Sequence, residues 1–319
     1  MTFYTEMLQL AKQMMAEFFF SLLILLVVSK QTNKTSRAFL SIVFILSIIV
    51  SHYGLSYIFL ISLFFTYLLI LLWKKRVGEF DTKIVTLNFM ALSIISAFAW
   101  YMNSAGSSAF EAVIGIGRHV IGNISEMFSP MEQGGVYWLV RKLSLTEEIL
   151  RFLYIISVLL IVIGLLDVLY QGLKKKKNII DSEYVFFSTT FLGWLLISII
   201  LPAVIARGSI GFTRVFHISS LLLAPFCIIG GIRVERVLSK LYKHGAGGSV
   251  LNAKNAIEAI SVFLAIFLLF NSSFVPEIIQ ETIGGDHAIS PSISKPRIER
   301  EGDVREKIAY YGFSYPIYD

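Results

Sequence analysis

The sequence predicts an all-α fold: a polytopic bundle of about eight transmembrane helices, with one further helix lying in the outer membrane interface. Composition is the first observation. Of 319 residues, 55% are hydrophobic and only 16% are charged, against about 25% charged in soluble domains, and mean hydropathy is +0.71. The second observation is that continuous apolar runs alternate with short polar connectors. Backbone groups in lipid must be hydrogen-bonded within their own segment, so each continuous run is expected to be a helix.

Charge and cysteine content exclude other classes of protein. The net charge of +6 is spread over the connectors, so it is not a nucleic-acid-binding signal, and we expect no nucleic-acid partner. The single cysteine, Cys227, lies in an apolar segment and has no intrachain partner. Intrachain disulfides and cysteine-based metal sites are therefore excluded.

Eight apolar runs are expected to cross the membrane. The first is treated as mature structure, because no small-residue cleavage site of a secretory signal follows it. In chain order, the predicted spans are 14–28, 38–51, 55–73, 84–102, 149–170, 184–206, 212–232 and 256–275. With these eight spans, residues 1–275 are predicted to form a transmembrane domain. Residues 276–319 form an outer polar tail, either truncated or the start of a soluble domain.

The second and third spans come from one apolar run that is too long for a single crossing, since about 20 residues span a bilayer. A polar, uncharged Ser-His-Tyr-Gly sequence, 51–54, interrupts it, and basic residues flank the run on both sides. We therefore predict a hairpin that turns at His52, Tyr53 and Gly54. Each arm is at the short end for a span, so a single long tilted helix is the competing interpretation.

Basic residues alternate between successive connectors, which predicts the orientation of the chain. The connectors 29–37, 74–83, 171–183 and 233–255 are rich in lysine and arginine. The connector around 51–57 carries none, and the one around 207–214 carries two. Basic connectors stay in the cytoplasm, so we expect the N-terminus, the segment 103–148 and the tail 276–319 to lie outside the cell membrane.

The long outer segment 103–148 contains an amphipathic stretch, 110–128, whose apolar residues recur at steps of three and four. We predict a helix lying in the plane of the interface. An outer N-terminus without a signal sequence is awkward for a complete protein. It favours a C-terminal part of a larger protein or one product of a split gene, with an upstream membrane chain as partner. The alternative is a true N-out protein inserted through its first hairpin.

Arg207, Arg214 and His217 are the sharpest candidate cluster for binding. Arg214 and His217 are three residues apart, so they share a helix face at the outer end of the seventh span. The planar guanidinium group is suited to phosphate, and a polyprenyl-phosphate head group lies at this depth. The plainer interpretation is that both arginines reach up to ordinary lipid phosphates.

His52 and Glu17 complete the candidate site. An imidazole near neutral pH can bind phosphate or relay a proton, but His52 could equally be a structural turn residue. Glu17 is a carboxylate in the outer half of a span, which is costly without a charged partner. Arg214, Arg207 and His52 are the candidate partners. We predict no metal site from these residues.

Three stretches resemble a known group of proteins. They are 17–20 (EFFF), 50–57 (VSHYGLSY) and 214–231 (RVFHISSLLLAPFCIIGG). They look like the C-terminal half of archaeal polytopic membrane proteins of uncharacterised function, which are themselves similar to GT-C glycosyltransferases. The resemblance covers roughly residues 10–235. It implies an enzyme relative that uses lipid-phosphate-linked sugars at the outer face, with a divalent metal as cofactor in a complete enzyme.

The same resemblance implies that this chain lacks a part. GT-C enzymes carry a catalytic acidic motif in their first outer loop, and no region here corresponds to it. We therefore expect a chain that binds a polyprenyl-phosphate-linked glycan through Arg207, Arg214, His217 and His52, and that alone transfers no sugar. The alternatives are a lipid-linked glycan flippase or transporter, which would need polar residues through the membrane, and a non-catalytic accessory membrane subunit.

Overall fold

The computed structural model describes residues 11–29, 31–77, 82–103, 114–115, 118, 145–174, 181–200, 212–245, 253–272 and 274–275. These residues contain helices and no strands, which confirms the predicted all-α class. The helices are α2 (Ala11–Val28), α3 (Lys34–Ser51), α4 (Tyr53–Val77), α5 (Leu87–Asn103), α8 (Leu145–Leu173), α9 (Ser182–Ile200), α11 (Phe212–Gly245) and α12 (Ala253–Asn271). Each overlaps one of the predicted spans.

Five of these helices are long and apolar enough to cross a membrane: α3, α4, α8, α9 and α11. Shorter apolar stretches occupy α5 and α12. The predicted interface helix within 103–148, residue Arg207 and the tail 276–319 fall outside the described residues, apart from isolated positions in the first of these.

The chain divides into two compact units. The larger contains α2 to α5, residues 156–173 of α8, α9, α11 and the start of α12. The smaller contains residues 145–155 of α8 and 259–271 of α12. In the smaller unit, the hydroxyl of Tyr154 donates to Oδ1 of Asn271 at 2.7 Å, and the rings of Tyr154 and Phe267 lie 5.0 Å apart.

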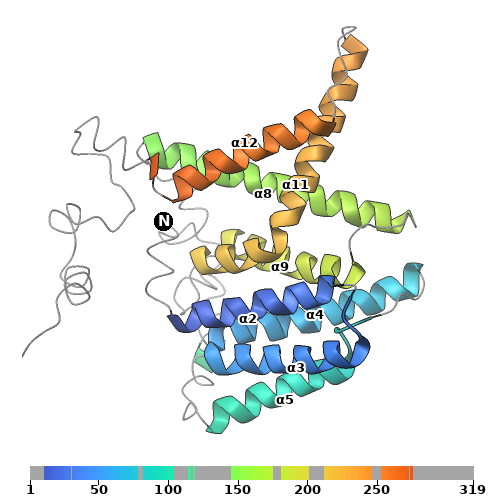
Figure 1. Ribbon diagram of the computed structural model, residues 1–319, viewed down its shortest axis with the longest axis vertical. Coiled ribbons are helices and arrows are strands. Elements are labelled where there is room, and N and C mark those ends of the chain that lie inside the picture. The colour runs from blue at the N-terminus through green and yellow to red at the C-terminus, as the bar shows by residue number, and fades with distance from the viewer. Residues whose placement is uncertain are drawn as a thin grey trace, which may run out of the picture. The chain divides into compact units, whose positions relative to one another are not determined.

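Within the larger unit, α2, α3, α4 and α5 lie side by side, and the chain reverses direction at each connector (Figure 1). Helix α9 packs against α4 and α2, and α11 packs against α9. Aromatic rings fill the centre, with Phe20 from α2 5.4 Å from Phe191 of α9, and Phe59 from α4 5.6 Å from Phe187 of α9. Two polar pairs, Trp194 with Ser62 and Thr190 with Thr66, tie α9 to α4 by hydrogen bonds between helices.

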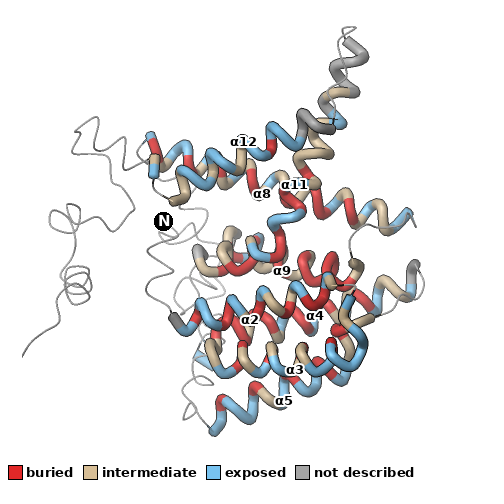
Figure 2. The backbone as a smooth tube through the Cα atoms, viewed as in Figure 1, coloured by how far each residue is buried: buried red, intermediate tan, exposed pale blue. Residues whose placement is uncertain are grey.

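Burial follows from this packing (Figure 2). Helices α4 and α9 bury much of their surface, whereas α3 and α5 expose rows of large apolar side chains. Examples are Phe39 of α3 and Ile95 of α5, each about two-thirds exposed. Such apolar surface would be a liability in water, and it suits contact with lipid.

The predicted interruption at residues 51–54 is confirmed. His52 has an extended backbone, with φ −154° and ψ 112°, and separates α3 from α4. The carbonyls at the end of α3 find partners across the turn, because Ser56 Oγ donates to Ile48 O at 3.1 Å and Tyr101 donates to Ile49 O at 2.9 Å. The single long helix is therefore excluded. The turn is tighter than predicted, since Tyr53 already begins α4.

Helix α11 differs most from its predicted bounds, because it continues to Gly245 rather than ending near residue 232. The prediction used the first arginines to mark the end of the membrane span. Charged residues end a span without ending a helix, and no glycine or proline follows Gly231 until Gly245. Pro225 lies inside the helix, where Tyr184 donates to the nearby Leu222 carbonyl at 2.5 Å.

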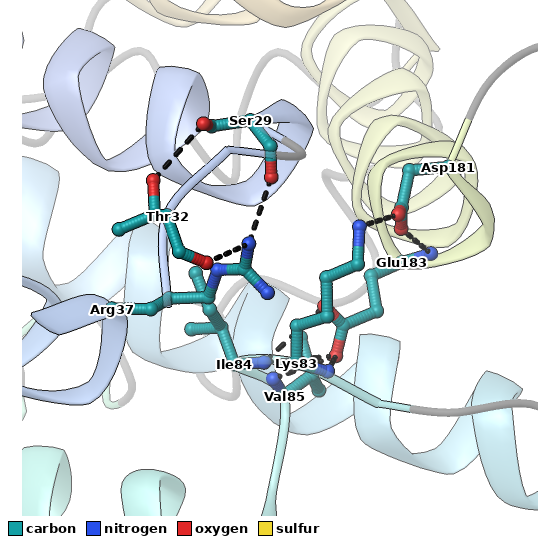
Figure 3. Close-up of polar contacts among 8 residues, drawn as sticks. All are labelled: Ser29, Thr32, Arg37, Lys83, Ile84, Val85, Asp181 and Glu183. Carbon is teal, nitrogen blue, oxygen red and sulfur yellow. Dashed lines mark hydrogen bonds and ion pairs between the residues drawn. The ribbon is translucent and has the colours of Figure 1, made fainter. Parts of the chain in front are cut away.

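At one end of the bundle, Val27 near the end of α2 lines a cavity together with Ile84 and Val85 of the connector before α5. Figure 3 shows the polar contacts of this region. Arg37 is buried and donates through Nη2 to the carbonyls of Ser29 and Thr32, at 2.9 and 3.0 Å. It thereby satisfies carbonyls at and beyond the end of α2. The side of the membrane that this end faces remains a prediction.

Candidate functional site

Five polar residues converge at the other end of the bundle, and we call them the polar cluster: Gln13, Glu17, His52, Arg214 and His217. Helix α2 supplies the first two, the junction of α3 and α4 supplies His52, and the first turns of α11 supply the last two. Four of the five were predicted as site residues.

Glu17 is the centre of the polar cluster. Its side chain is only 7% exposed, and each of its oxygens has a different partner. Gln13 Nε2 donates to Oε1 at 2.7 Å, and Nδ1 of His217 lies 3.3 Å from Oε2. Gln13 and Glu17 are four residues apart on α2, so they share one helix face. The carboxylate lies beside Nδ1 of His217, the position at which a proton on that nitrogen would be favoured.

His52 has the structural turn role that was one of its two interpretations, and its binding role stays a prediction. Its Nδ1 accepts the backbone N–H of Leu55 at 3.1 Å, so the ring caps the first turn of α4. The ring also stacks on Tyr53, with centroids 5.5 Å apart. An accepting Nδ1 carries no proton, so the neutral ring keeps its N–H on Nε2, where it can donate to a ligand.

Electrostatics link His52 to the rest of the polar cluster. Burial lowers the pKa of His52, the positive charge of Arg214 lowers it further, and the negative charge of Glu17 acts in the opposite direction. The net effect is a lowered pKa, so His52 is neutral at pH 7. The permanent positive charge of the cluster is then that of Arg214.

The described contact of Glu17 adds a partner that was not predicted. Arg214, Arg207 and His52 were the candidates; Arg207 lies outside the described residues, and Nδ1 of His217 lies 3.3 Å from the carboxylate. Gln13 was missed, although its spacing from Glu17 was a usable signal.

Asp167 of α8 is a second carboxylate within the helix packing. It lies 3.3 Å from Nε of Arg233 in α11 and accepts from Gln171 Nε2 at 2.7 Å. Both contacts join or stay within α8 and α11, which is the pattern of a structural residue.

Glu183, a carboxylate at the end of the bundle opposite the polar cluster, was not singled out from the sequence. Glu183, at the start of α9, accepts the backbone N–H groups of Lys83, Ile84 and Val85 through Oε1, at 2.8, 3.1 and 2.9 Å (Figure 3). The Lys83 ammonium group pairs with Asp181. These partners are mostly backbone groups, and the arrangement joins a connector to a helix.

No group of metal-binding side chains accompanies the polar cluster in the described part of the chain. Among the residues described, no three His, Cys, Asp or Glu side chains are placed to hold a metal ion. An apolar cavity of about 20 Å³ lies between α2, α4, α9 and α11, lined by Phe20, Phe59 and Phe187 among others. It has room for about one water molecule, so it is not a head-group site.

Comparison with known proteins assigns the family. No curated protein and no solved structure matches the chain. A family of membrane proteins, described as "Predicted membrane protein (DUF2206)", matches residues 37–305, which is most of the chain. The match includes His52, Arg214 and His217. The apolar helices agree with that description, and the chain belongs to the DUF2206 family of predicted membrane proteins.

Proposed function

We propose that this chain binds the phosphate group of a polyprenyl-phosphate-linked glycan at the outer face of the cell membrane. The observation that supports the proposal is the polar cluster: Arg214 and His217 of α11 and His52 between α3 and α4 lie near one buried carboxylate, that of Glu17 in α2. Polar groups at this position in an apolar bundle are costly, which favours a functional role for them.

The charges of the polar cluster suit an anion. Arg214 provides a permanent positive charge, and His52 can offer Nε2–H as a donor. Glu17 would repel a phosphate if it were bare, but its two oxygens are occupied by Gln13 and His217. When His217 is protonated, its charge offsets that of Glu17 beside it.

The finer part of the proposal is a relationship to GT-C glycosyltransferases. It rests on the resemblance of residues 17–20, 50–57 and 214–231, and the polar cluster draws its residues from these three stretches and from Gln13 nearby. In such a relative, the cluster would hold the lipid phosphate of the donor. A flippase would move this head group through the bundle, and an accessory subunit would present it to another chain.

Replacement of Arg214 by alanine should weaken binding of the lipid roughly ten- to a hundredfold, because a hydrogen bond between charged groups contributes about 1.5–3 kcal/mol. The measurement is a titration of the chain, reconstituted in nanodiscs, with a polyprenyl phosphate that carries one hexose. Arg236→Ala is the matched control. Arg236 is exposed on the same helix, about 33 Å further along.

Arg236→Ala should change the affinity less than twofold, because an exposed arginine far from the polar cluster contributes only screened, long-range attraction. Equal losses in the two variants would reduce the interaction to non-specific attraction and contradict the proposal. Failure of this lipid to bind the wild-type chain would contradict the proposal as well.

The proposal also requires the polar cluster to face outside. Asn103 is exposed at the end of α5, the helix that contacts the end of α3 through Tyr101, and Lys75 is exposed at the other end of the bundle. In a Cys227→Ala background, Asn103→Cys should react with an impermeant maleimide in intact cells. Lys75→Cys should react only after permeabilisation. The reverse pattern would overturn the orientation predicted from the basic connectors.

A further inference from the structure

Gln13 carries a hydrogen-bond acceptor for which the described part of the chain provides no donor. Its side chain is 6% exposed, and Oε1 is buried without a hydrogen-bond partner. The amide orientation is set by chemistry, because Glu17 Oε1, 2.7 Å away, can only accept and must therefore face the NH2 group. Oε1 then points away from the carboxylate with its lone pairs unpaired.

An acceptor of this kind is unfavourable unless a donor reaches it, so most buried polar atoms in proteins are paired. The surroundings restrict the donor. Arg214 acts on this cluster with a positive charge, which disfavours an ammonium or guanidinium group as the ligand donor. A neutral hydroxyl group can donate a hydrogen bond to Oε1 and adds no second positive charge.

We propose that Gln13 Oε1 accepts a hydrogen bond from a sugar hydroxyl group of the ligand, so that the polar cluster recognises a glycosylated lipid phosphate and not lipid phosphate alone. The inference rests on the proposed function, and it adds the residue that distinguishes the sugar. Arg214 and His52 hold the phosphate, while the row of Gln13, Glu17 and His217 faces the adjoining hydroxyl groups.

The test compares two lipids that share one polyprenyl chain and one negative charge. One is polyprenyl phosphate carrying a hexose, and the other is its methyl phosphodiester, which has no hydroxyl group. Wild-type protein in nanodiscs should bind the hexose lipid about three- to tenfold more tightly, as expected for one neutral hydrogen bond. This comparison needs no variant, so it does not depend on how well a mutant folds.

Two variants then assign the preference to Gln13. Gln13→Met keeps the length of the side chain and should bring the affinity ratio of the two lipids to about one, through weaker binding of the hexose lipid. Gln171→Met is the matched control, because Gln171 also donates to a carboxylate four residues away, in α8. It should leave the ratio unchanged.

The outcomes separate this inference from the proposed function. Equal affinities in wild type would mean that a water molecule pairs with Gln13, which overturns the inference while phosphate binding stands. A ratio that survives Gln13→Met would place sugar recognition elsewhere and also overturn it. Failure of both lipids to bind would overturn the proposed function together with the inference.

Discussion

Replacement of Gly230 by alanine is expected to lower the free energy of unfolding by about 3 kcal/mol, the upper part of the usual range for overpacking. Helices α8 and α11 touch here through their backbones. A Cβ atom added to Gly230 would lie 1.8 Å from the Leu160 carbonyl oxygen, and one added to Gly164 would lie 2.0 Å from that of Phe226. Backbone atoms cannot move aside as a flexible side chain does, so the two helices must separate.

Separation would also disturb the next turn of the same crossing. The ion pair between Asp167 and Arg233 lies three residues beyond the two glycines, and Asp167 is buried. The measurement is thermal or denaturant unfolding of the purified protein in detergent. Small residues permit this close approach in membrane helix pairs generally, which is why a single methyl group has a large effect.

Gly193 is the matched control, since it is also a glycine within an apolar helix. A Cβ atom at Gly193 would meet nothing within 4 Å. Gly193→Ala should therefore leave stability unchanged or raise it by about 0.5–1 kcal/mol through helix propensity. Equal destabilisation by both substitutions would show that the α8–α11 contact is not as close as described.

The helices were largely predictable because each is a continuous apolar run with polar ends. The break at His52 was predictable for the same reason, since the run was too long for one crossing. The end of α11 was not, because charges mark the edge of a membrane and not the end of a helix. The pairing of α8 with α11 was not predicted either, although Gly164 and Gly230 carry it.

The members of the polar cluster could be found by residue type and depth, since Glu17, His52, Arg214 and His217 are polar groups near the ends of apolar runs. Their mutual contacts could not be found. Glu17 and His217 are 200 residues apart, and the rotation of α2 and α11 about their axes decides which side chains meet. Arg37 was counted only as one basic residue of the connector 29–37, whereas it is buried and donates to two carbonyls.

Glu183→Ala is the second substitution with a large expected effect, a loss of about 3–5 kcal/mol, because each buried N–H group left without an acceptor costs about 1–3 kcal/mol. The side chain is 1% exposed and accepts three consecutive backbone N–H groups, from Lys83 to Val85. Alanine would leave these groups without an acceptor. Ile84 and Val85 are themselves buried, so water cannot easily replace the carboxylate.

Glu183→Gln should have an intermediate effect, because its carbonyl oxygen can still accept while its NH2 group faces other donors. Glu148→Ala is the control, since Glu148 is half exposed and its oxygen is 3.6 Å from Arg151. A surface pair of this kind contributes about 0–1 kcal/mol. The measurement is again unfolding in detergent.

Hydrogen exchange adds a local reading of the same change. The amides of residues 83–85 should lose protection in Glu183→Ala while those of α4 keep it, because the substitution removes their acceptor and not the bundle core. Unchanged protection at these amides would mean that another group accepts them. The Lys83–Asp181 pair would then hold the connector 82–86. Any loss of unfolding free energy in Glu183→Ala would come from lost packing of the side chain alone.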